Sequence, residues 1–123
     1  MAANRLLIVD DQPALGEIVR RTAEGLDYEV MVTTHADQFM AEYENFDPTT
    51  IVLDIVMPDI DGIELVAWLV ERKCGARILV ASGYNNRYAK MAETLGAAKG
   101  LEIMFLEKPF RINELRDALV SAE

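Results

Sequence analysis

The amino-acid sequence predicts an α/β fold in which helices cover both faces of a five-stranded parallel sheet. Five short apolar runs recur along the chain, and each is followed by a segment with apolar residues at helical spacing. This alternation is typical of parallel strands joined by helices. The chain has 123 residues, of which 51% are hydrophobic and 27% are charged. Because no linker or repeat interrupts them, we expect residues 1–123 to form a single domain with a (βα)5 pattern.

The five predicted strands are continuous apolar runs, as expected for strands that are buried on both faces. They cover residues 6–9, 28–32, 51–53, 78–81 and 103–106. Strands of this length fit the usual range for a globular domain.

The predicted helices fill the segments between these strands and follow the last one. Pro13 suits the first turn of a helix, and Gly25 suits its end. Asp61 is a natural N-cap for the third helix, with Glu64 placed to complete a capping box. The predicted core-facing stripes are Leu15, Ile18, Val19 and Thr22; Ala36, Phe39, Met40 and Tyr43; Leu65, Val66 and Leu69; Tyr88, Met91, Ala92 and Leu95; and Ile112, Leu115, Ala118 and Leu119.

Charge and composition exclude several classes of function. The formal net charge is −9, so a nucleic-acid backbone would be repelled and we expect no direct nucleic-acid binding. One cysteine and one histidine can form neither an internal disulfide nor a structural zinc cluster. No apolar run approaches the length of a membrane span, and no signal peptide opens the chain. We therefore expect a cytoplasmic protein without a membrane partner.

Charged and polar side chains follow four of the five predicted strands. Asp10 and Asp11 follow the first, Asp54 the third, Ser82 the fourth and Lys108 the fifth. Sites in open parallel sheets lie beyond the carboxyl ends of the strands, so these residues are the candidate site. Three carboxylates brought together repel one another unless a cation intervenes, and Mg²⁺ or a similar hard ion such as Mn²⁺ prefers oxygen ligands.

Each of these residues also has a simpler interpretation when it is considered alone. Asp10 and Asp11 are then more typical of a helix N-cap before Pro13. Ser82 is more typical of a turn, and Lys108 of a surface cation. Their joint occurrence at successive strand ends favours a common site.

Asp54 is the strongest candidate for chemistry at this edge. It directly follows a predicted central strand, and a turn between Pro58 and Gly62 is expected to leave its carboxylate accessible. A carboxylate can attack phosphorus and form an aspartyl phosphate when a metal and hydrogen-bond donors offset the charge. Ser82 and Lys108 could supply a hydroxyl and an ammonium group to the phosphoryl oxygens.

These residues resemble the receiver domain of two-component response regulators over nearly the whole chain. The matching segments are residues 7–11 (LIVDD), 52–62 (VLDIVMPDIDG), 81–83 (ASG) and 108–110 (KPF). The resemblance implies a doubly wound, flavodoxin-like sheet of order 2-1-3-4-5. It also implies a phosphoryl donor, which is a sensor histidine kinase or a histidine phosphotransfer protein.

The resemblance further assigns roles to the acidic residues. Asp54 would be the phosphoacceptor. Asp11 and Asp54 would bind Mg²⁺ directly, together with the backbone carbonyl of Val56, and Asp10 would contact the metal through a bound water.

Other positions would bind the phosphoryl group and transmit its presence. Ser82 and Lys108 would contact its oxygens, and Ser82 with Phe105 would form a switch that changes the face of the fourth helix, fifth strand and fifth helix for a downstream protein partner. Phe105 lacks the hydroxyl of a tyrosine and is also interpretable as plain core. Val56 and Tyr84 would set the lifetime of the phosphorylated state, and we expect both to obstruct attacking water.

The sequence thus favours a signalling switch that catalyses only its own phosphorylation and dephosphorylation. A phosphatase with an aspartyl-phosphate intermediate usually has a second acid two residues after the nucleophile, where this chain has Val56. A nucleotide hydrolase is disfavoured because no P-loop follows the first strand. The remaining alternative is a receiver-like interaction module that acts without phosphorylation.

Overall fold

The computed structural model describes residues 4–54, 62–82, 94, 100–108 and 110–120 of the chain. Its strands are β1 (Arg5–Val9), β2 (Glu29–Thr33), β3 (Thr50–Asp54), β4 (Arg77–Ser82) and β5 (Ile103–Glu107). Its described helices are α1 (Pro13–Glu24), α2 (Ala36–Phe46), α3 (Gly62–Glu71) and α5 (Ile112–Val120). The helix predicted around Tyr88–Leu95 and the Asp61 cap lie outside the described residues. In the described part of the chain, no helix is long and apolar enough to cross a membrane.

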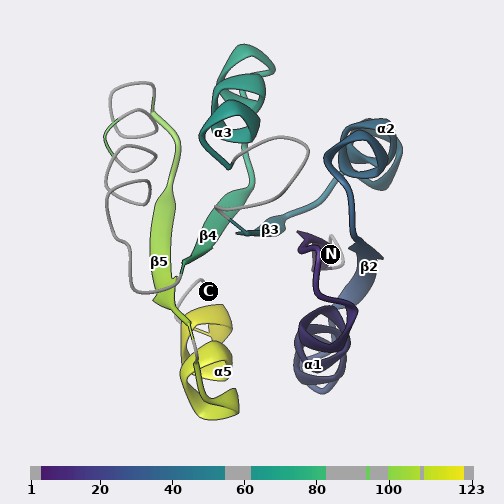
Figure 1. Ribbon diagram of the computed structural model, residues 1–123, viewed down its shortest axis with the longest axis vertical. Helices are drawn as coiled ribbons and strands as arrows, with labels where there is room; N and C mark the ends of the chain where they lie inside the picture. The colour runs from purple at the N-terminus through teal and green to yellow at the C-terminus, as the bar shows by residue number, and fades with distance from the viewer. Residues whose placement is uncertain (1–3, 55–61, 83–93, 95–99, 109, 121–123) are drawn as a thin grey trace.

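The five strands form one parallel sheet of order β2-β1-β3-β4-β5, which confirms the predicted fold class. β1 pairs with β3 in a register that sets Val9 beside Leu53, and β3 pairs with β4 so that Asp54 lies beside Ala81. The carboxyl ends of β1, β3 and β4 therefore meet at one edge of the sheet, as Figure 1 shows.

The sheet separates two apolar layers, with α2 and α3 on one face and α1 and α5 on the other (Figure 1). Alternation along β1 divides its side chains between them: Leu7 and Val9 pack in the α2–α3 layer, and Leu6 and Ile8 in the α1–α5 layer. All four are fully buried, so β1 has no polar face. This explains why its sequence is a continuous apolar run.

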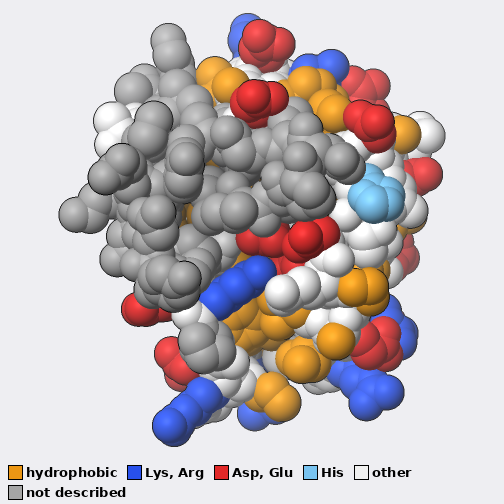
Figure 2. All heavy atoms as spheres, in the orientation of Figure 1, with side chains coloured by type: hydrophobic (Ala, Val, Ile, Leu, Met, Phe, Trp, Pro, Cys, Tyr) orange, Lys and Arg blue, Asp and Glu red, His pale blue; other side chains and the backbone are white. Residues whose placement is uncertain are grey.

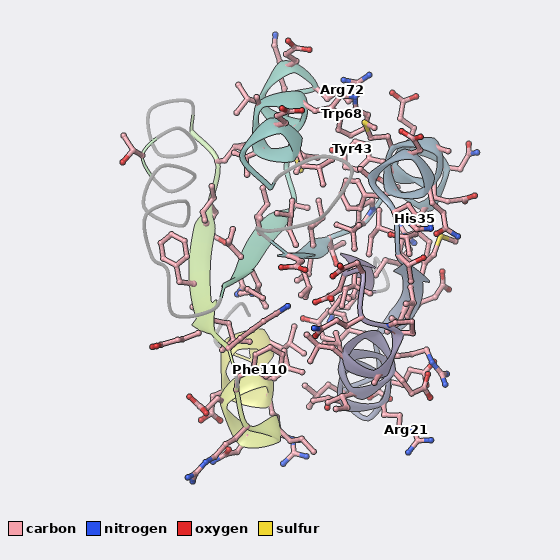
Figure 3. All side chains as sticks on the ribbon, in the orientation of Figure 1. Arg21, His35, Tyr43, Trp68, Arg72 and Phe110 are labelled. Atoms are coloured by element: carbon pink, nitrogen blue, oxygen red, sulfur yellow. The ribbon has the colours of Figure 1, made fainter. Side chains whose placement is uncertain are left out.

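Aromatic side chains join α2 to α3 at the outside of the first layer. The ring of Trp68 meets Tyr43 edge-on with centroids 5.3 Å apart, and the Arg72 guanidinium lies 3.7 Å from the Trp68 centroid (Figure 3). Burial is the main cause that raises the pKa of the Tyr43 phenol, so this hydroxyl stays neutral. The cluster has a packing role, since it lies between two helices.

Among the described residues of the predicted helical stripes, Ile18 and Ile112 are exposed. Ile18 is 42% exposed because α1 turns Gly16, Val19 and Ala23 toward the sheet instead. A Cβ atom on Gly16 would lie 2.9 Å from the Val32 side chain, so the helix approaches β2 closely at a glycine. Ile112 is 52% exposed because the buried stripe of α5 begins one turn later, at Leu115.

Candidate functional site

Three carboxylates converge at the carboxyl edge of the sheet. Asp10 directly follows β1, and Asp54 ends the neighbouring strand β3. Asp10, Asp11 and Asp54 each offer an oxygen, and these oxygens lie within 4.8 Å of one another. Acidic and basic side chains meet near the middle of the face in Figure 2. The structure therefore brings together the three acids that the sequence predicted to converge.

The three acids differ in environment. Asp10 is 2% exposed and Asp54 is 5% exposed, whereas Asp11 is exposed to solvent. Asp10 Oδ1 accepts a hydrogen bond of 2.9 Å from the backbone N–H of Gln12. The N-cap of α1 is Gln12, so the alternative in which Asp10 or Asp11 serves as that N-cap is wrong. The Asp10 bond fixes the turn that leads into the helix.

Lys108 supplies the positive charge among these acids. Its Nζ donates to Asp10 Oδ2 at 2.9 Å and lies 3.4 Å from Asp54 Oδ1. The lysine follows β5, which is two strands away from β3 in the sheet, and its long side chain crosses that gap. Burying two carboxylates without such a partner would cost several kcal/mol each, on the order of the desolvation penalty of an ion. Lys108 therefore offsets the burial of Asp10 and Asp54.

Asp54 is more enclosed than the sequence led us to expect. Only 6% of its side chain is exposed, so the prediction of an accessible carboxylate is wrong for this state. The reason is its position at the end of β3, every residue of which is buried, next to the Lys108 ammonium. The Lys108 side chain is itself only 19% exposed, so the ion pair is largely removed from solvent.

The donor set fits a hard divalent cation. Three carboxylates and one ammonium give the cluster a formal charge of −2. The available atoms are oxygens, which Mg²⁺ and Mn²⁺ prefer, and the exposure of Asp11 leaves room for ligands from water. Neutralising the remaining charge would relieve the repulsion between carboxylates that share one site.

The other predicted site residues are only partly covered by the described chain. Val56 and Tyr84 lie outside it. Ser82 ends β4, and its backbone is described although its side chain is not. Phe105 is half-buried on β5 beside Val80 and packs against the α2–α3 layer. The roles assigned to these four residues stay predictions.

The sequence did not indicate the bond between Lys108 and Asp10. It assigned Lys108 to a phosphoryl group and Asp10 to a metal-bound water, whereas the structure pairs the two side chains directly. They are 98 positions apart, and no local pattern marks such a pair. The only available signal was their placement at strand ends.

Comparisons with known proteins match most of the chain. A family model described as the response regulator receiver domain matches residues 6–120. The transcriptional regulatory protein TrcR of Mycobacterium tuberculosis is 30% identical over 111 residues, covering 90% of this chain and 42% of that regulator. The chemotaxis protein CheY of Listeria monocytogenes is 26% identical over 119 residues, and this match covers 96% of this chain and 97% of that CheY.

Solved structures show the same fold. The receiver domain of a response regulator from Bermanella marisrubri superimposes with a TM-score of 0.84 at 27% identity, over 98% of both chains. CheY4 of Vibrio cholerae has a TM-score of 0.84 at 24% identity, over 99% of this chain and 100% of its own, and supports the fold alone. The chain thus spans nearly the whole length of CheY from Listeria monocytogenes and less than half of TrcR.

Removing the Lys108 ammonium is expected to strengthen binding of a divalent cation. The Lys108→Ala variant keeps the three carboxylates and loses the cation that competes for them, so its affinity for Mg²⁺ should rise by about tenfold, or about 1.4 kcal/mol. Isothermal titration calorimetry with MgCl₂ measures this directly. Lys73→Ala is the matched control, because Lys73 is an exposed lysine outside the cluster and its loss changes the net charge equally. Equal affinities of the two variants would contradict the role given to Lys108.

Proposed function

The chain belongs to the response regulator receiver domain family, and from this premise we propose that it is a phosphoacceptor switch that takes a phosphoryl group onto Asp54 with the help of Mg²⁺. The observation that carries the proposal is the position of Asp54. It ends a buried central strand, it shares a cluster with Asp10 and Asp11, and it lies 3.4 Å from the Lys108 ammonium. A carboxylate in such surroundings has nearby groups that can balance the charge of an incoming phosphoryl group.

The proposed transfer starts from a phosphohistidine on a partner protein. One carboxylate oxygen of Asp54 attacks phosphorus, so a P–O bond forms while the P–N bond breaks and its electron pair stays on the imidazole nitrogen, which takes up a proton. In the dephosphorylation step, water attacks the phosphorus of the aspartyl phosphate. The P–O bond to Asp54 breaks, Asp54 returns to a carboxylate, and inorganic phosphate is the other product. A bound Mg²⁺ supplies charge neutralisation for the carboxylates and the phosphoryl oxygens.

Lys108 has to move for this reaction to occur. Its Nζ now contacts Asp10 and Asp54, and the Asp54 side chain is only 6% exposed. The four-carbon side chain of a lysine lets its ammonium follow a new anionic partner at small cost. We therefore propose that Lys108 turns from the two carboxylates to an oxygen of the phosphoryl group, with the Ser82 hydroxyl as a second donor.

Receiver domains interact with histidine kinases and downstream effectors, and the proposal assigns this chain a kinase or a histidine phosphotransfer protein as donor. TrcR is named a transcriptional regulatory protein and CheY a chemotaxis protein, so relatives of this family differ in output. We propose that the switch acts in the cytoplasm. When Ser82 is drawn to the phosphoryl group, Phe105 turns inward behind it. The only catalysis proposed is that on the chain itself.

Phosphorylation by a small donor tests the proposal. Incubation with acetyl phosphate and Mg²⁺ is expected to add the mass of one phosphoryl group to the intact protein, as measured by mass spectrometry. Asp54→Asn should abolish the gain because the nucleophilic carboxylate is lost, and chelation of Mg²⁺ should abolish it in the unaltered chain. Asp37→Asn, an exposed acid in the first turn of α2, is the matched control and should label normally. Labelling of the Asp54→Asn variant would refute the assignment.

The residues at positions 56 and 84 are expected to make the phosphorylated state persistent. Val56 and Tyr84 carry neither an acid nor an amide that could orient water, so Val56→Asn combined with Tyr84→Glu should speed dephosphorylation by about tenfold or more. Release of inorganic phosphate from the purified phosphorylated protein measures the rate. A faster release from the unaltered chain than from the double variant would overturn this expectation.

A further inference from the structure

The outer edge of β2 is an unprotected strand edge. In the part of the chain that the structure describes, β2 pairs only with β1 and forms one margin of the sheet (Figure 1). Its sequence, Glu-Val-Met-Val-Thr, contains neither proline nor lysine, which commonly block strand edges, and its one charged residue is the exposed Glu29 at its first position. Val30, Met31 and Val32 are all half-buried, so the strand remains partly open to solvent. Such an edge is a template for another strand.

The hydrogen bonds to β1 show which backbone groups point outward. The Glu29 N–H donates to the Asn4 carbonyl, and the Thr33 carbonyl accepts from the Asp10 N–H. Because successive residues of a strand face opposite sides, Glu29, Met31 and Thr33 direct their backbone groups to β1. The N–H and C=O groups of Val30 and Val32 therefore point away from the sheet.

This pattern is complementary to itself. An antiparallel partner whose two-fold axis passes through Met31 places Val30 opposite Val32 of the second copy and Glu29 opposite Thr33 of the second copy. In this register both valine pairs are hydrogen-bonded pairs, because their backbone groups are the ones that point outward, and the two Met31 residues form the non-hydrogen-bonded pair between them. All five residues of β2 gain a partner, and no like charges face each other across the junction. An isologous contact of this kind closes as a dimer.

We propose that the β2 edge pairs with the β2 edge of a second copy of this chain, joining the two sheets into one. The contact is small, since it joins two five-residue strands and the adjoining surfaces of α1 and α2, so the dimer is a weak one. Each copy carries a net charge of −9, which opposes association at low ionic strength. Dimerisation should therefore increase with salt as this repulsion is screened.

Sedimentation velocity over roughly a hundredfold range of protein concentration tests the proposal. The unaltered chain is expected to shift from monomer to dimer with rising concentration, and more so at higher ionic strength. Val30→Pro removes an N–H that points outward and leaves the ladder to β1 complete, so it should give a folded monomer. A monomer at every concentration of the unaltered chain, or a dimer that Val30→Pro does not weaken, would overturn the proposal.

Cross-linking tests the register even if Val30→Pro fails to fold. Met31→Cys brings two cysteines together at the two-fold axis, in a pair whose Cβ atoms lie about 4.5–5.5 Å apart, so mild oxidation should give a disulfide-linked dimer. Glu29→Cys is the matched control, because the two copies of position 29 lie four residues out of register. The native Cys74 is buried and contributes little background. Cross-linking of Glu29→Cys that equals or exceeds that of Met31→Cys would contradict the register.

Discussion

The contact on which the site depends is the ion cluster of Lys108 with Asp10 and Asp54. A parallel sheet places the carboxyl ends of its central strands at one edge, and this chain has acids at two adjacent ends. Two of the three carboxylates are almost fully buried, which requires a cation close by. Lys108 meets that need only in part, because one ammonium among three carboxylates leaves a charge of −2. The remaining charge is what a divalent cation at this edge would neutralise.

The same contact involves the carboxylate that is proposed to react. Lys108 lies 3.4 Å from Asp54, so the group that would stabilise a bound phosphoryl group now contacts the carboxylate that would accept it. Exposed Asp11 and the partly exposed Lys108 mark the side from which a donor would reach the cluster. In the proposed switch, binding of a divalent cation, movement of Lys108 and access to Asp54 would be linked, because all three involve the charges of the same carboxylates.

Sequence patterns predicted the strands, the helices and the residues of the site better than they predicted the contacts between those residues. The apolar runs predicted all five strands, because the central strands β1, β3 and β4 are buried on both faces and β2 and β5 are still largely apolar and half-buried. Helical spacing failed at Ile18, since a glycine at position 16 lets α1 turn a different face to β2. The predicted end of α1 at Gly25 is confirmed, since Gly25 is its C-cap, and the left-handed residue of the following turn is Asp27 at φ 67°. The enclosure of Asp54 and its link to Lys108 arise from the packing of distant strands, which no local pattern records.

The central claim is that, of the three clustered carboxylates, the one at position 54 receives the phosphoryl group. Chemical trapping distinguishes them: after reaction with acetyl phosphate and Mg²⁺, sodium borohydride reduces an acyl phosphate to an alcohol and leaves free carboxylates unchanged. Peptide sequencing by mass spectrometry then locates the reduced residue. The account predicts homoserine at position 54 and intact aspartates at positions 10 and 11. Homoserine at position 10 or 11, or a phosphorylated protein without any reduced aspartate, would contradict it.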